Sequence, residues 1–298
     1  MNSSNQSPDI AEAMLDATVR LNESISSLNP NNETNTPSEY PNAPGVPDDA
    51  ISAHLDNILC TTEIESTTRF STAIWYEKIR EQDVNILGVG GIGSYVSFLI
   101  ARMKPRSITL YDSDRVDATN MGGQLYQRTD IGEYKVDSAQ KIASNFCNYY
   151  STYGYRMLFN EFDNFYGRIV ICGFDNMAAR KAAFSSWKRT VYASRDEVKH
   201  EFLFIDGRLA AEEFQVLCIG GTDDYHIKMY EENWLFDDSE AEETVCSYKQ
   251  TSFAANMIAS VMVNLFVNFC ANLCNPLIER DVPFLTRYDA TTMFFKTE

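Results

Sequence analysis

The stretch from residue 84 to residue 112 constrains the fold of this chain more than any other. A short apolar run at 84–89 predicts a buried strand, a helical stretch follows, and a second strand at 107–111 stops at Asp112. Between the first strand and the helix lies a cluster of glycines: Gly88, Gly90, Gly91 and Gly93. Glycines let the backbone approach phosphate oxygens, and a helix N-terminus offers them free N–H groups. Strand, glycine turn, helix, strand and acidic residue together predict a nucleotide site.

The glycine turn alone does not decide which nucleotide is bound. Three of its glycines satisfy the dinucleotide fingerprint, and Asp112 stands near the expected spacing of about 20 residues, so an NAD-dependent enzyme stays open at this point. The polar loop that follows Asp112 is less typical of a dehydrogenase. It carries carboxylate, amide and ammonium groups on Asp114, Asn120, Gln124 and Lys135. Such a set suits the sugar and phosphates of a nucleoside triphosphate.

The rest of the chain alternates predicted strands with predicted helices. Further strands are expected at 155–159, 168–172, 202–205 and 214–219, and helices at 135–150, 177–192 and 252–274. This order predicts an α/β fold, with a Rossmann-like, mainly parallel sheet, helices on both faces and an extension by C-terminal strands. The glycine turn, Asp112 and Asp175 all fall at the carboxyl ends of strands, where such sheets bind nucleotides.

Charge is distributed unevenly along the 298 residues. The net charge is −17, and residues 1–65 hold eleven acidic residues against one basic residue. Five of the nine prolines lie between positions 30 and 47. We therefore expect an acidic, largely disordered tail at 1–65 and one domain at 66–298. The acidic balance argues against a nucleic-acid-binding surface, which needs clustered basic residues.

The apolar stretch at 252–274 is long enough to cross a bilayer. Asn264, Asn268 and Asn272 recur every four residues on it, and a lipid-facing stripe of amides would be costly. A buried helix without membrane contact is the interpretation we favour. The seven cysteines include no CxxC pair, and no export signal is recognisable, so we expect reduced thiols, a cytoplasmic location and no structural zinc.

Six short elements, in order, resemble those of the ThiF-like adenylyltransferases, the fold shared with ubiquitin-activating enzymes. They are a GxGGxGS turn at 88–94, DxDxV at 112–116, NxxxQ at 120–124, GxxK at 132–135, a DN pair followed by Arg180 at 175–180, and a YDAxT-like segment at 288–292. The resemblance covers residues 69–295. In lacking zinc cysteines, the chain resembles compact family members found in bacteria and large phages. For a phage protein, the location would be the host cytoplasm.

The resemblance implies ATP and Mg²⁺ as ligands and assigns roles to individual residues. Lys135 would contact the phosphates, Asp175 would hold Mg²⁺, and Asp112 would bind the ribose hydroxyls. Asp114, Asn120, Gln124 and the four turn glycines would complete the nucleotide site. From the residues alone, simpler readings stay open: a solvated lysine at 135, a helix N-cap at 175 and a turn-forming carboxylate at 112.

The chain also departs from the family pattern. An arginine usually precedes the glutamine of the third element and helps to neutralise the triphosphate, but here Gly123 stands there. Arg128, on the same loop, is our candidate replacement. The family's entry helix lends an arginine to a neighbouring subunit, but its position here holds Thr72, with Arg69 one turn earlier.

Cys246 is the second chemical centre that the sequence offers. It resembles the thiol that receives the activated acyl group or sulfur in some family members. Lys249 and the predicted helix start near residue 252 would lower the pKa of its thiol, whereas the acidic run at 237–243 would raise it. An unreactive loop cysteine is the alternative.

These features lead us to expect an ATP-dependent adenylyltransferase. Its catalytic candidates are Lys135, Asp175, Arg128 and Cys246. Its substrate would be the C-terminal carboxylate of a ubiquitin-like or sulfur-carrier protein or of a peptide. The apolar helix at 252–274 would support a homodimer, and Arg208 would lie near the site. Two alternatives stay open: a catalytically weakened ATP-binding module of the same fold, and an NAD-dependent oxidoreductase.

Overall fold

The computed structural model describes residues 67, 69–210, 212–237, 250–275 and 279–298. The predicted acidic tail at 1–65 and Cys246 lie outside these residues, so the expectations for them stay predictions.

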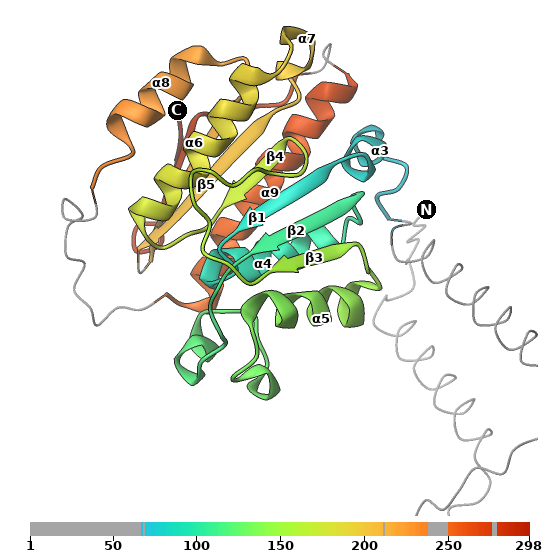
Figure 1. The fold of residues 1–298 in the computed structure, drawn as a ribbon, viewed down its shortest axis with the longest axis vertical. Helices are drawn as coiled ribbons and strands as arrows, with labels where there is room; N and C mark the ends of the chain where they lie inside the picture. The colour runs from blue at the N-terminus through green and yellow to red at the C-terminus, as the bar shows by residue number, and fades with distance from the viewer. Residues whose placement is uncertain (1–66, 68, 211, 238–249, 276–278) are drawn as a thin grey trace, which may run out of the picture. The chain divides into compact units, whose positions relative to one another are not determined.

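One eight-stranded sheet organises the described part of the chain, with the strand order β3-β2-β1-β4-β5-β6-β7-β8 (Figure 1). Its strands are β1 (Asp83–Leu87), β2 (Ser107–Tyr111), β3 (Thr152–Tyr155), β4 (Ile169–Cys172), β5 (Leu203–Ala210), β6 (Glu213–Gly220), β7 (Leu285–Asp289) and β8 (Phe294–Thr297). The first five strands pair in parallel, and β6, β7 and β8 extend the sheet in antiparallel pairing. The predicted Rossmann-like α/β fold with C-terminal strands is therefore confirmed.

Helices cover both faces of the sheet. The helices α3 (Ile74–Arg80), α4 (Gly91–Ala101), α5 (Lys135–Cys147) and α9 (Ser252–Cys274) supply the apolar cluster on one face. The helices α6 (Met177–Ala193) and α8 (Asp224–Asn233) supply the cluster on the other. Three short elements complete the described part: η1 (Ala118–Gly122), η2 (Arg128–Asp130) and α7 (Asp196–Lys199).

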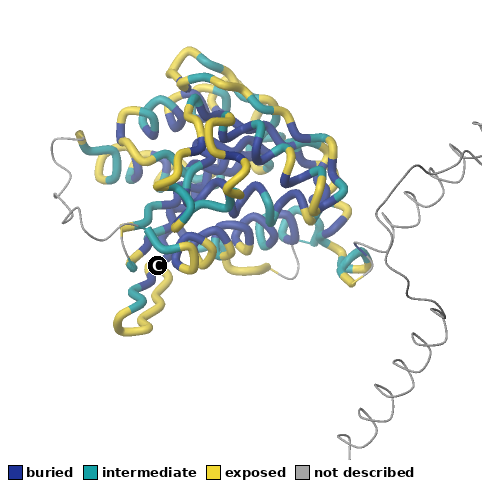
Figure 2. Tube along the Cα trace, turned by 90° about the horizontal axis from the view of Figure 1, so that it is seen from below, coloured by how far each residue is buried: buried dark blue, intermediate teal, exposed yellow. Residues whose placement is uncertain are grey.

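The central strands are buried on both faces, and apolar side chains occupy most of their positions. In β1, Ile86 belongs to the cluster under α4 and α9, while its neighbour Leu87 belongs to the cluster under α6. Figure 2 shows this buried centre in dark blue, with exposed positions on the outer sides of the helices. Strands buried on both faces read as continuous apolar runs, which is why β1, β2 and β4 were recognisable from the sequence.

Helix α9 passes the length and composition test for a membrane span, and here its apolar side packs on the sheet and on α3 and α4. Its amide stripe has a structural explanation. The side chain of Asn268 donates to the carbonyl of Asp281 at 2.9 Å, and Asn272 both donates to and accepts from the backbone of Arg280. The amides therefore fix the segment that leads into β7.

Two predicted strand boundaries were wrong. We expected a strand at 155–159, but β3 ends at Tyr155, because Phe159 instead stacks on Phe165 in a loop cluster. We expected a strand to stop at 205, but β5 continues to Ala210, because antiparallel pairing with β6 holds the polar residues after Ile205 in the sheet. Helix α8, which Asp223 caps, was not anticipated.

The order of the strands creates the place for a site. From β1 the chain winds through β2 and β3 on one side, and it then crosses to β4 and β5 on the other. The chain therefore leaves the adjacent carboxyl ends of β1 and β4 in opposite directions along the sheet. Ligands bind α/β sheets at such a switch point.

Candidate nucleotide site

The glycine turn after β1 has no room for side chains at two positions. Gly88 has a φ of +78°, and a Cβ there would stand 3.0 Å from the backbone of Gly173, which follows β4. A Cβ at Gly93 would overlap the carbonyl oxygen of Gly88. Helix α4 can therefore begin directly against the turn. Its N-cap, Gly90, offers no side-chain cap, so the first N–H groups face the space above the strands.

Asp112 directly follows β2 and holds the glycine turn through its carboxylate. Its two oxygens accept the N–H groups of Val89 at 2.7 Å and Asp114 at 2.8 Å. Burial raises the pKa of Asp112 above its ordinary value of 3.8, and the Lys135 ammonium opposes that rise. Each carboxylate oxygen keeps capacity for a further hydrogen bond, as binding of ribose hydroxyls would require.

Lys135 is the first residue of α5, and its side chain points into the site. It is largely buried, and its ammonium donates to Asp114 at 2.8 Å. Tyr126, which the sequence did not single out, donates to the carbonyl of Val89 and, at 3.4 Å, to that of Lys135. Burial raises the pKa of Tyr126 well above 10.0, so its hydroxyl stays a donor that ties the glycine turn to α5.

The loop between β2 and α5 brings only part of the predicted set to the cavity. Gln124 lines the cavity, and its buried Oε1 has no hydrogen-bond partner. Asn120 and Arg128 do not line it. The Asn120 amide accepts the N–H of Asp117 in a capping box of η1. Arg128 is exposed at the start of η2, so the structure does not bring our candidate replacement for the family arginine to this cavity.

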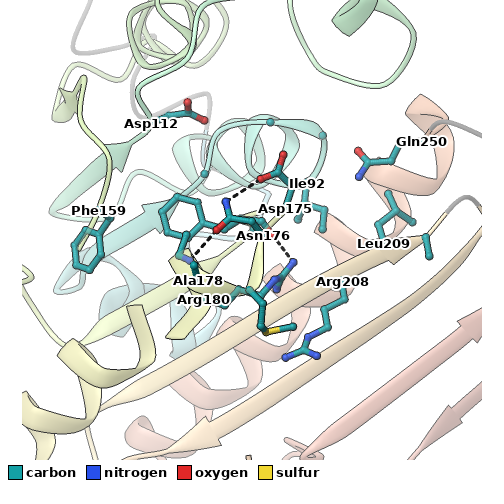
Figure 3. A pocket seen from close by; sticks show the side chains of 18 of the residues that line it. Ile92, Asp112, Phe159, Asp175, Asn176, Ala178, Arg180, Arg208, Leu209 and Gln250 are labelled. Carbon is teal, nitrogen blue, oxygen red and sulfur yellow. Dashed lines mark hydrogen bonds between the residues drawn. The ribbon is translucent and has the colours of Figure 1, made fainter. Parts of the chain in front are cut away.

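Asp175 faces the same space from the loop after β4 (Figure 3). The simpler reading, a helix N-cap, is wrong for this residue. Asn176 is the N-cap of α6, because its side chain accepts the N–H of Ala179 at 2.8 Å. The Asp175 carboxylate is exposed to the cavity and accepts a 3.3 Å hydrogen bond from the side-chain amide of Asn176.

Beneath this loop lies a buried ionic cluster that the sequence did not reveal. Asp206, fully buried in β5, accepts from the guanidinium of Arg180, from Arg208 Nε at 2.8 Å and from the Tyr230 hydroxyl at 3.0 Å. Arg180 also donates to the carbonyl of Phe174. The cluster therefore fixes the loop that carries Asp175. Arg208 lines the cavity, near the site as expected, and it belongs to the extended end of β5.

One cavity of about 1360 Å³ joins these groups. Its first end is formed by the glycine turn, Asp112, Lys135 and Asp175. Its second end extends over β5 to β8, past Phe214, Gln215, Arg287 and Phe294. Pockets for small ligands usually measure about 300–1000 Å³, so there is room for a nucleotide and for part of a second reactant.

The residues present fit a magnesium-bound nucleoside triphosphate. The N-terminus of α4, which has no side-chain cap, the unpartnered Gln124 oxygen and the Lys135 ammonium suit phosphate and sugar groups. Within the described residues, no three His, Cys, Asp or Glu side chains gather as a metal cluster. A single carboxylate such as Asp175 is nevertheless sufficient, because Mg²⁺ commonly uses one or two carboxylates together with substrate phosphates and water.

The described cysteines are poor nucleophiles. Cys172 and Cys218 are buried, and burial raises the pKa of each thiol to about 12. Burial also raises the pKa of Cys147, Cys270 and Cys274. A thiol with a raised pKa is mostly protonated at neutral pH and reacts slowly. Any acyl-accepting thiol would therefore have to come from outside the described residues, where Cys246 lies.

The sequence model of the ThiF family matches residues 64–297. This chain belongs to the ThiF family. Among curated proteins, ubiquitin-like modifier-activating enzyme 5 of Caenorhabditis briggsae is 30% identical over 142 residues, covering 44% of this chain and 33% of that protein. The Bombyx mori enzyme of the same name is 37% identical over 70 residues, covering 24% and 18%. The chain thus spans about a third or less of the length of these relatives.

Solved structures share the fold of this ThiF-family chain at low identity. PaaA has a TM-score of 0.56 at 14% identity, with 99% of this chain and 83% of that chain covered. E. coli MccB, solved with ATP, has a TM-score of 0.54 at 15% identity, with coverages of 85% and 79%. At these identities the likeness concerns the fold alone.

Proposed function

We propose that this protein is an ATP-dependent adenylyltransferase that activates the C-terminal carboxylate of a small ubiquitin-like or sulfur-carrier protein or of a peptide. The observation that carries the proposal is the meeting of the glycine turn, Asp112, Lys135 and Asp175 in one cavity at the switch point of the sheet. Membership of the ThiF family and the likeness to ubiquitin-like modifier-activating enzyme 5 support the same activity.

Each side chain then has a distinct task. Asp112 accepts hydrogen bonds from the ribose hydroxyls, and the N-terminus of α4 and Lys135 bind phosphate oxygens, with Asp114 holding the lysine in place. Asp175 would hold Mg²⁺, which supplies positive charge to the triphosphate. Bond formation between the substrate carboxylate and the α-phosphorus brings two anions together, so preorganised positive groups lower the barrier.

The second end of the cavity supports a polypeptide substrate. It runs away from the glycine turn over β5 to β8, and both apolar and charged side chains line it. An extended chain terminus can lie along such a groove with its carboxylate near the phosphates. MccB, which shares the fold, has been solved with MccA-N7isoASN as well as with ATP.

Exchange of labelled pyrophosphate into ATP tests this activity directly. We expect the purified protein to bind ATP·Mg²⁺ in calorimetry and NAD much more weakly. We expect exchange only when a protein or peptide ending in a flexible glycine-rich tail is added, and a C-terminal amide on that tail should abolish it. Tight binding of NAD with no binding of ATP would overturn the proposal.

A catalytically weakened ATP-binding module is the second candidate, and one observation favours it. The arginine that the family places before the glutamine is Gly123 here, and Arg128 lies outside the cavity. Binding of ATP without exchange against a panel of such tails would support the module.

If exchange occurs, Cys246→Ala should leave it intact and abolish only a thioester or persulfide product. Homodimer formation through α9 is an additional expectation that sedimentation can test.

A further inference from the structure

Gln250 fills the space that the absent side chains of two glycines leave. A Cβ at Gly91 would overlap Oε1 of Gln250, and a Cβ at Gly123 would stand 2.7 Å from the Gln250 carbonyl oxygen. Gly91 begins α4, and Gly123 belongs to the loop before α5, so one residue packs against both phosphate-facing segments. Gly123 is therefore not an open position: the Gln250 backbone occupies the place in which a larger side chain would start.

The position of Gln250 is set by the helix that it precedes. Thr251 is the N-cap of α9, and its hydroxyl accepts the N–H of Ala254 at 3.4 Å. Helix α9 packs along α4 within the same apolar cluster. Figure 3 shows the Gln250 side chain above Leu209, across the cavity from Asp112 and Phe159. Its amide therefore lies beside the uncapped N-terminus of α4.

We propose that Gln250 is a phosphate-binding residue that replaces the arginine missing at position 123. This inference rests on the proposed function, because it assumes that a triphosphate lies against the glycine turn. The terminal torsion of glutamine is broad, so rotation exchanges Oε1 and Nε2 and turns the amide N–H groups toward an anion. A neutral amide then supplies the hydrogen bonds for the β- and γ-phosphates that a guanidinium would otherwise supply.

Calorimetry on the full chain with ATP·Mg²⁺ and with AMP tests the assignment. Gln250→Ala should weaken ATP binding about tenfold, because a hydrogen bond to a charged group contributes roughly that much. The nearly isosteric Gln250→Glu should weaken it further, since it places a negative charge by the phosphates. Binding of AMP should be unchanged in both variants. Gln127→Ala, which alters an exposed glutamine outside the cavity, is the matched control and should bind both nucleotides normally.

A second variant tests whether Gly123 acts through Gln250. Gly123→Ala introduces a Cβ against the Gln250 carbonyl and should weaken ATP binding by displacing the amide. In the Gln250→Ala background the same change should cause little additional loss of ATP affinity. The effects of substitutions at contacting residues are coupled and do not add. Thermal unfolding of each variant verifies that the fold is kept.

The outcomes separate this assignment from the proposed function. If the wild-type protein does not bind ATP, the proposed function itself fails. If the wild type binds ATP and Gln250→Ala binds it equally well or more tightly, only the role of Gln250 is overturned. An equal loss of AMP binding, or a loss as large in Gln127→Ala, also overturns it.

Discussion

Two ion pairs lie beside the same cavity and differ in almost every physical respect. In the first, the Lys135 side chain is 9% exposed and its partner Asp114 is 63% exposed. In the second, Arg180 is 8% exposed and Asp206 is fully buried, with Arg208 and Tyr230 as additional partners. A half-exposed pair is weak and can open to a ligand, whereas a buried cluster cannot lose a member cheaply. This difference agrees with the proposed binding role of the first pair, whereas the second pair positions the loop before α6.

The largest effect should come from breaking the buried cluster. Asp206→Ala leaves two guanidinium groups without their carboxylate, and we expect the free energy of unfolding to fall by about 3–5 kcal/mol. Urea denaturation measures this change in the free energy of unfolding. Asp114→Ala is the matched control from the other pair and should change stability by no more than about 0.5 kcal/mol. Similar losses in both variants would contradict the division of roles.

The next largest effect should be catalytic. Lys135→Ala removes the ammonium that we propose to bind the phosphates, and we expect pyrophosphate exchange to fall about 10²–10³-fold, as when a preorganised charge-stabilising group is lost. Lys141→Ala, an exposed lysine on the same helix, should exchange at the wild-type rate. A wild-type rate in Lys135→Ala would show that this lysine is not at the phosphates.

The same contrast explains what the sequence could predict. The glycine turn, Asp112 and Lys135 were predictable because short segments with a local motif carry them. Asp206 was not, because a charged residue in the middle of a buried strand is acceptable only with partners that come from α6, α8 and β5 itself. Gln250 was missed for a related reason. Its contacts with Gly91 and Gly123 depend on how α9 packs on α4, and no local pattern records that packing.

A smaller effect should appear in the pH dependence of nucleotide binding. Burial raises the pKa of Asp112, so its carboxyl group is protonated at a higher pH than an ordinary aspartate. The Asp112 carboxylate, which we propose to accept hydrogen bonds from the ribose hydroxyls, is thus present above the raised pKa and is lost as the pH falls through it. Asp112→Asn should weaken binding of adenosine by about 1.5–3 kcal/mol at neutral pH.

Calorimetry of the wild type and of Asp112→Asn, between pH 7 and the lowest pH at which both stay folded, tests the direction of this pH dependence. The ratio of the two dissociation constants should shrink toward one as the pH falls, and titration of the ligand cancels in that ratio. A ratio that does not change with pH would mean that the Asp112 carboxylate does not contact the ribose. The folded state itself should favour the protonated form, so ionisation of Asp112 reduces stability as the pH rises.

The smallest effect concerns the exposed member of the first pair. Asp114→Asn keeps an oxygen for the Lys135 ammonium but removes the charge, so affinity for ATP·Mg²⁺ should weaken by no more than about fivefold, or ~1 kcal/mol. Because Asp114 is largely exposed, salt should screen its interaction, and the ratio of variant to wild-type affinity should approach one as salt is raised. A loss as large as that of Lys135→Ala, persisting at high salt, would mean that Asp114 contacts the nucleotide or its metal directly. The pair would then belong to the reacting centre, and the exposed position of Asp114 would reflect access for the ligand and not weakness of the interaction.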